Sequence, residues 1–277
     1  MPRGSSSRKP KTMSKNMVKQ VEKIVDKAIS EELEEKRAIQ QKDAVQLLNT
    51  IASGDVTNIS NFNELLPPIN QVIANTKTGT VTPGLEGAYG YRIGDEINLK
   101  SVKIKGYVNM IDVTTDQSDE AKIGVRVMIL KQKDKDSYAG FLADAHTDKL
   151  LLDQVNSAGQ MGPGVFDGSP LDLIKDINRN VFSVRYDKLM YLSRDVITGG
   201  TSGRLSVSSK DSLRFFEHEL SFGNGKKLQF TDADSTTPNN FPYLLVVAVA
   251  DLANPNTTIP SGLVRLTYNA TAVYTDA

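Results

Sequence analysis

The residues whose type and spacing most clearly suggest a chemistry are lysines near the N-terminus. Lysine occupies every fourth position from residue 11 to residue 27, and the same spacing continues with Glu31 and Glu35. Residues four apart lie on nearly the same face of an α-helix, so these lysines would form one cationic stripe. Ammonium groups bind phosphates without selecting a base sequence. The pattern predicts a nucleic-acid-binding segment with these candidate contacts: Arg3, Arg8, Lys9, Lys11, Lys15, Lys19, Lys23 and Lys27.

Two other interpretations of the lysine stripe stay open. A charged helix face that is simply solvated has the same spacing. A basic amphipathic helix lying on a membrane also fits, because Met17, Val21, Ile24 and Ala28 fall on the side opposite the lysines. The charge distribution favours nucleic acid. Residues 1–30 hold eight Lys and Arg against two acidic residues, a charge of +6, whereas the whole chain is formally neutral.

Residues suited to catalysis are sparse. The sequence contains no nucleophile elbow, Walker loop, zinc-protease motif or dinucleotide fingerprint. The absence of cysteine excludes disulfides, thiolate metal sites and a cysteine nucleophile. Of the two histidines, His218 alternates with apolar residues and is expected in the core, whereas His146 lies in a polar stretch and is expected at the surface. We therefore predict no enzyme activity and no cofactor.

Acidic clusters are the remaining candidates for metal binding. Calcium takes six to eight oxygen ligands, and loops at a subunit interface could supply some of them. None of the clusters has EF-hand spacing, so we expect solvated loops and no metal site. The clustered residues are Asp112, Asp116, Asp119 and Glu120, followed later by Asp232 and Asp234.

Three regions are expected to position these residues. Residues 1–52 form a basic arm, with a disordered start and an amphipathic helix from about Met13 to Leu48, because residues 11–53 contain no Pro or Gly. Residues 53–90, rich in Gly and Pro, are expected to be a linker. Residues 91–277 are expected to form one folded domain. No run of 18 apolar residues and no signal-peptide core occur, so we expect synthesis in the cytoplasm or nucleus.

The hydrophobic period changes to two from residue 91. Apolar residues alternate along 97–110 with a change of phase near Ser101, which a β-bulge would produce. Further alternating strands are expected at 121–132, 181–193 and 263–274, with a hairpin turning through Gly223-Asn224-Gly225. The stretch FPYLLVVAVAD is apolar on both faces, which is typical of a strand covered on both sides. Long polar connections favour an antiparallel sandwich with Greek-key crossings.

Several of these strands resemble those of one viral family. The segments GYRIGDEINLKSVKIKGYV, RNVFSVRYDKLMYLS, LRFFEHELSFGNGKKLQF and FPYLLVVAVAD, with the tyrosine-bearing last strand, are similar in order and texture to jelly-roll capsid proteins of small circular Rep-encoding single-stranded DNA (CRESS-DNA) viruses. The resemblance covers most of residues 85–277. Unlike many such capsids, this arm lacks a dense arginine run.

The resemblance implies an all-β fold, a single eight-stranded antiparallel jelly roll preceded by the basic helical arm. It also implies a structural virion protein that self-assembles into an icosahedral shell and packages single-stranded nucleic acid, with DNA favoured over RNA. Assembly would take place in the host nucleus or cytoplasm, with an unknown host receptor. The alternatives are a capsid protein of a small RNA virus, which shares the jelly roll and basic arm, and a glycan-binding jelly-roll module. Membrane contact by the N-terminal helix is a weaker alternative.

Overall fold

The computed structural model divides into two units, residues 1–35 and residues 36–277. In the first unit, residues 16–21 and 24 are helical and their side chains are exposed. The second unit is all-β with a few short helices. The structure describes residues 16–21, 24, 35–48, 61–71, 91–111, 121–194, 211–232, 234–252 and 263–277.

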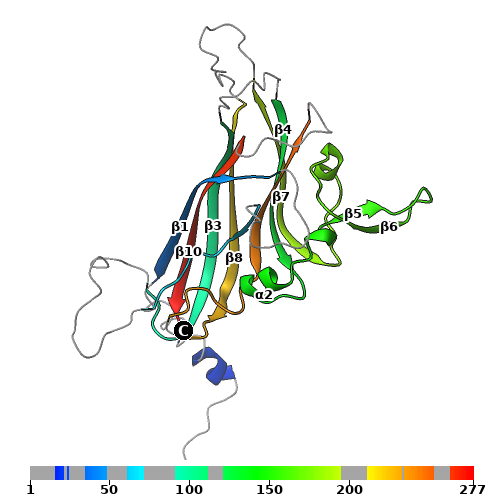
Figure 1. Cartoon of the computed structure of the whole chain (residues 1–277). Coiled ribbons are helices and arrows are strands. Elements are labelled where there is room, and N and C mark those ends of the chain that lie inside the picture. The colour runs from blue at the N-terminus through cyan, green and yellow to red at the C-terminus, as the bar shows by residue number, and fades with distance from the viewer. Residues whose placement is uncertain are drawn as a thin grey trace, which may run out of the picture. The chain divides into compact units, whose positions relative to one another are not determined.

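Two four-stranded antiparallel sheets form a sandwich in the second unit (Figure 1). Sheet A has the strand order β1-β10-β3-β8, and sheet B has the order β2-β9-β4-β7. Each step along the chain between these strands crosses to the other sheet, except the step from β4 to β7. The bounds are β1 Lys36–Gln46, β2 Phe62–Glu64, β3 Glu96–Met110, β4 Ala121–Gln132, β7 Phe182–Arg194, β8 Leu213–Gln229, β9 Tyr243–Asp251 and β10 Val264–Asp276.

The main core lies between the two sheets. On β3, Ile97 and Leu99 point inward on one side of a phase change, and Val102 and Ile104 point inward on the other. The register with β8 shifts between Leu99 and Ser101, which confirms the irregularity expected near Ser101. Alternation along β3 therefore buries one face and leaves the other to solvent.

A second core covers the outer face of sheet B. Residues 133–181, here called the covering segment, contain α2 (Tyr138–Ala143), η2 (Thr147–Lys149), the β5 (Leu151–Gln154) and β6 (Met161–Gly164) ribbon, and η3 (Pro170–Leu173). Its apolar side chains pack on outward-facing residues of β4 and β9. Every residue of β9 except Asp251 is buried, which confirms the prediction of a strand covered on both sides. The β5–β6 ribbon projects away from the sheets (Figure 1).

The helix expected to continue to Leu48 is wrong for residues 36–46. This stretch is strand β1, which pairs antiparallel with β10 from Lys36 opposite Tyr274 to Gln46 opposite Arg265. The free edge of β10 supplies backbone partners that a helix does not need, and pairing there outweighs the helix propensity of the sequence. Of the expected helix, residues 16–21 and 24 are observed as helical.

The expected linker also contributes to the sandwich. Within residues 53–90, strand β2 pairs with β9, from Phe62 opposite Val246 to Glu64 opposite Leu244. Leu65, Leu66 and Ile69 are buried in the main core. Residues 61–71 thus hold one short strand and several buried apolar residues, so this part of the expected linker packs into the sandwich, and the Pro67-Pro68 pair lies within it.

The hairpin expected through Gly223-Asn224-Gly225 is also wrong. Strand β8 continues along β3 on both sides of these residues, because Ser221 lies opposite Ser101 and Lys226 lies opposite Leu99. The residues between them form a bulge, in which Gly223 and Gly225 adopt φ values of 56° and 99°. Glycine reaches this left-handed region at little cost, so the same residues that suggest a turn support a bulge.

Candidate nucleic-acid interface

The predicted nucleic-acid contacts lie mostly outside the described residues. Of the eight, only Lys19 is described, and it lies exposed on the helical stretch 16–21. Met17, Val21 and Ile24, expected on the opposite side of this helix, are also exposed. No helix among the described residues is long and apolar enough to span a bilayer. The stripe therefore stays a prediction, with its helical conformation observed at residues 16–21 and 24.

The outer face of sheet A is a polar surface that the strand register defines. Side chains from neighbouring strands form cross-strand rows, such as Ile39, Thr271, Lys103 and Glu219. The next rows toward the C-terminal end of β3 are Gln41, Asn269, Lys105 and Glu217, and then Thr267, Tyr107 and Phe215. Hydroxyl, amide and charged groups dominate this face, as is typical of a sheet face in contact with water.

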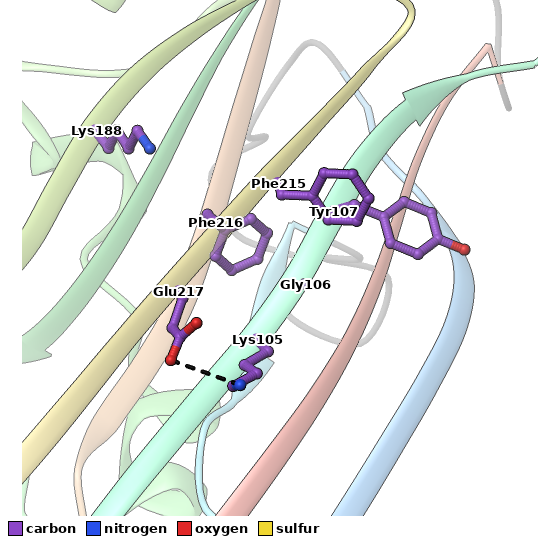
Figure 2. A pocket seen from close by; sticks show the side chains of 7 residues that line it. All are labelled: Lys105, Gly106, Tyr107, Lys188, Phe215, Phe216 and Glu217. Carbon is purple, nitrogen blue, oxygen red and sulfur yellow. Dashed lines mark ion pairs between the residues drawn. The ribbon is translucent and has the colours of Figure 1, made fainter.

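An exposed aromatic pair interrupts this polar face. Tyr107 on β3 lies directly opposite Phe215 on β8, with ring centroids 5.7 Å apart in an edge-to-face arrangement. Phe215 is 68% exposed, so little of its apolar surface is protected by the pairing. The two rings border an open hollow of about 600 Å³ along β8 (Figure 2), lined by Lys105, Gly106, Tyr107, Lys188, Phe215, Phe216 and Glu217.

Lysines surround the single carboxylate that lines the hollow. Lys103 lies 2.7 Å and Lys105 3.7 Å from Glu217, and Lys188 lines the hollow from β7. The hydrogen bond from Lys103 lowers the pKa of Glu217, and the same contact raises the pKa of Lys103. Glu219 lies one row farther along β8. The hollow and its margin thus hold three lysines against two glutamates, beside two aromatic rings.

The outer face of sheet B offers no comparable polar surface, because a buried ion network fixes the covering segment there. The Arg126 guanidinium binds Asp187 with two hydrogen bonds of 2.8 and 2.7 Å. It also donates to the carbonyl oxygens of Asp172 and Lys175, at 3.3 and 2.6 Å. Gly124 makes room for the segment, since a Cβ there would lie 2.1 Å from Leu173 Cδ1.

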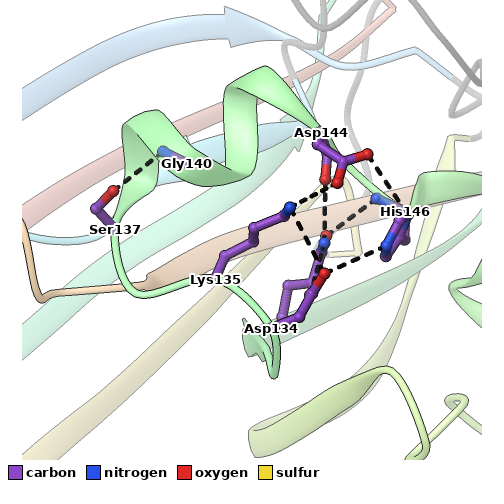
Figure 3. Close-up of polar contacts among 7 residues, drawn as sticks. Asp134, Lys135, Ser137, Gly140, Asp144 and His146 are labelled. Atoms are coloured by element: carbon purple, nitrogen blue, oxygen red, sulfur yellow. Dashed lines mark hydrogen bonds and ion pairs between the residues drawn. The ribbon is translucent and has the colours of Figure 1, made fainter.

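A polar cluster with metal-ligand residue types lies at the start of the covering segment (Figure 3). One ligand atom each from Asp134, Asp144 and His146 lies within 4.8 Å of the others. The Lys135 ammonium is 2.5 Å from Asp144 and 3.5 Å from Asp134. Because this cation already lies against both carboxylates, the cluster is accounted for as a network that fixes the turn after β4, and we assign it no metal.

The two histidines, His218 expected in the core and His146 at the surface, are both partly buried. His218 points into the sandwich, with its ring 4.6 Å from the Tyr186 ring, and burial lowers its pKa. His146 is partly buried in the turn network, 3.4 Å from Asp134. Of the acidic clusters, Asp232 caps a turn by accepting a hydrogen bond of 2.8 Å from the Ser235 amide. Residues 112–120 lie outside the described part of the chain.

Sequence reasoning missed three features. Arg92, in the segment GYRIGDEINLK, is fully buried over the Phe230 ring and donates to the carbonyl oxygens of Asp232 and Ser235. The Arg126 network and the Tyr107–Phe215 pair were also missed. A charged residue within an apolar alternation signals Arg126, whereas the local sequence of Arg92 gives no such signal, and only strand register brings Tyr107 to Phe215.

Comparison with known proteins supplies no identity. No known family model matches the chain, and no curated protein matches it significantly.

Proposed function

We propose that this protein is a viral capsid protein, whose sandwich is an eight-stranded jelly roll that assembles into a closed shell. The carrying observation is the strand order, β1-β10-β3-β8 facing β2-β9-β4-β7. Crossing between the sheets at nearly every step is what two Greek keys in a jelly roll would require, and it supports the proposal. Capsids are one class built on this architecture, and lectins and cupins are others, so the fold alone does not specify the function.

The charge distribution supports a capsid over the other jelly-roll classes. The segment that precedes β1 holds the lysine stripe, and residues 1–30 carry a charge of +6 on an otherwise acidic chain. A basic arm on an acidic body is suited to a polyanion, whereas a glycan-binding module has no need of it. In this proposal the arm binds the packaged genome and the sandwich forms the wall.

The genome is proposed to be single-stranded DNA, with RNA as the alternative. This preference rests on the resemblance of the strand segments to CRESS-DNA virus capsids, since lysine contacts to phosphate do not distinguish the two. Sequencing nucleic acid that native particles protect from nuclease decides between them.

The test compares the full chain with a variant whose stripe lysines are neutral. Lys11, Lys15, Lys19, Lys23 and Lys27 are changed to Gln, which keeps the helix-forming character of the segment. A variant that lacks the arm altogether should begin no later than Lys36, because a protein that begins at residue 54 would lack strand β1. A matched control neutralises five lysines of the sandwich: Lys100, Lys122, Lys133, Lys149 and Lys227.

We expect closed particles with nuclease-protected nucleic acid from the wild type and the control, and particles without it from the stripe variant. If six to eight cations contact phosphate, binding should weaken roughly 10³-fold between about 50 and 200 mM salt. Wild-type protein that forms only monomers or small oligomers and binds no nucleic acid would contradict the proposal. Glycan binding by such a protein would favour the lectin-like alternative.

A further inference from the structure

The Tyr107–Phe215 hollow on sheet A has features that the lysine arm does not explain. The core does not require an aromatic residue at position 215. A polar residue could occupy it, as Glu217 and Glu219 occupy the next outward positions of β8. The residue there is instead Phe215, an aromatic residue that is 68% exposed and held against Tyr107. An exposed aromatic pair in an open hollow is a surface that a planar ligand can cover.

We infer that this hollow binds a base of the single-stranded nucleic acid, which stacks on Phe215 and Tyr107 while Lys105 and Lys188 contact the flanking phosphates. Stacking platforms combined with cations are the usual means of binding single strands without sequence preference. The inference rests on the proposed function and names a second point of contact for the same ligand. It differs from the arm in requiring bases as well as phosphates.

The geometry of the hollow fits this ligand in three respects. Its volume, about 600 Å³, lies within the range of sites that hold small molecules. Its lining combines aromatic rings with two lysines and one glutamate. Lys103 lies 2.7 Å from the Glu217 carboxylate and pairs with it. Lys105 lies farther from the same carboxylate, at 3.7 Å, and so is better able to contact a phosphate.

Single-residue variants separate stacking from charge. Phe215→Ala removes the most exposed ring, and its exposure means that folding should be retained. Ile39→Ala is the matched control, because Ile39 is also exposed on the outer face of sheet A but lies on β1, at the opposite edge of the sheet and three strands from β8. Glu217→Gln removes the negative charge from the hollow and leaves both rings in place.

The experiment measures binding of two fluorescein-labelled oligomers of equal length to the full chain by anisotropy. One is an oligothymidine and the other is an abasic oligodeoxynucleotide with the same phosphates. We expect the wild type and Ile39→Ala to bind oligothymidine about tenfold more tightly than the abasic oligomer, as one stacked base would give. Phe215→Ala should abolish this difference without changing abasic binding, and Glu217→Gln should strengthen binding of both.

Equal binding of the two oligomers by the wild type would overturn the inference and leave the proposed function standing. Binding of neither oligomer would contradict both. If Phe215→Ala blocks particle assembly while the preference for bases persists, the hollow is a contact for a neighbouring subunit and the inference is wrong.

Photocrosslinking gives a second, independent readout. An oligomer that carries 5-iodouracil should crosslink to peptides containing Tyr107 or Phe215, because the reactive base lies against these rings. Crosslinks confined to residues 1–35 would contradict the inference.

Discussion

The two outer faces of the sandwich differ although the same fold builds both. On sheet B, Leu244, Val246 and Ala248 of β9 point outward and are buried under the covering segment. On sheet A, outward-facing Lys103, Lys105 and Phe215 contact solvent, and nothing among the described residues covers them. Among the described residues, one face is closed by the protein's own chain and the other is left uncovered.

This difference arises from the connections between strands. The link from β4 to β7 is long enough to fold back over sheet B and to bring its own apolar side chains. The ion pairs on the two faces also differ in how far they are buried. Arg126 on the covered face is 7% exposed and hydrogen-bonded to Asp187 and two carbonyl oxygens. Lys103 and Glu217 on the open face are solvated, where such pairs contribute little stability.

The largest expected effect comes from truncating one phenylalanine on each face. Phe166, in the covering segment, is fully buried in the second core. Phe166→Ala should lower the free energy of unfolding by about 4 kcal/mol, because it removes buried apolar surface and leaves a cavity. Phe215→Ala should change it by less than about 0.5 kcal/mol. Urea denaturation measures both, and similar losses would contradict the contrast between the faces.

Breaking one ion pair on each face should give the next largest difference. Asp187→Ala leaves the Arg126 guanidinium buried without its carboxylate, which should cost about 3 kcal/mol. Glu217→Ala, in contrast, leaves lysines that water can solvate, and should have a much smaller effect. Denaturant titration of both variants provides the comparison. An Asp187→Ala protein as stable as the wild type would mean that the network does not hold the covering segment.

The smallest expected effect is on the pH dependence of stability. One carboxyl on each face should change the free energy of unfolding with pH, and the two changes should have opposite signs. On β2, Glu64 lies opposite Leu244, and burial raises its pKa to about 7 against an opposing effect of Lys42. The folded state therefore binds this proton more tightly than the unfolded chain, so its contribution is present below about pH 4.5 and is lost as pH rises through about 7.

Glu64→Gln should remove roughly 2 kcal/mol of this pH-dependent change in stability. Glu217, whose pKa is lowered by Lys103, should contribute the reverse, with stability lost as pH falls. Unfolding free energies of the wild type and Glu64→Gln at about pH 5 and about pH 8 check the sign for Glu64. Those of the wild type and Glu217→Gln at about pH 3 and about pH 5 check the sign for Glu217, because its pKa lies below the ordinary value. A wild type and a Glu64→Gln variant with the same pH profile would show that Glu64 titrates normally.

Much of the sandwich could be predicted because its strands carry their own signal. The alternation along β3, its phase change near Ser101 and the continuous apolar run of β9 each gave a correct prediction. The phase of His218 among apolar neighbours correctly predicted that it faces the other sheet, although it is only partly buried. These are local patterns, and burial on one or both faces imposes them on the residues directly.

Strand β1 shows where local pattern fails. Its inward positions, opposite inward residues of β10, include Ala38, Gln40 and Lys42. Because β1 is an edge strand of sheet A, an inward position can carry a polar residue such as Lys42, which is exposed, so the period of two is hidden. The remaining composition, rich in Ala, Gln and Lys, favours a helix in isolation. Residues 36–46 form a strand only because they pair with β10, which lies more than 200 residues away in the sequence.

The sequence by itself determined the all-β class, the main buried strands and the charge separation between the N-terminal segment and the rest, since composition and period encode these directly. Tertiary structure alone decided which strands are neighbours, that Gly223 and Gly225 form a bulge, and that Tyr107 meets Phe215. The reason is physical. Register is a long-range pairing of backbone groups, and it brings together side chains whose local sequences carry no sign of one another.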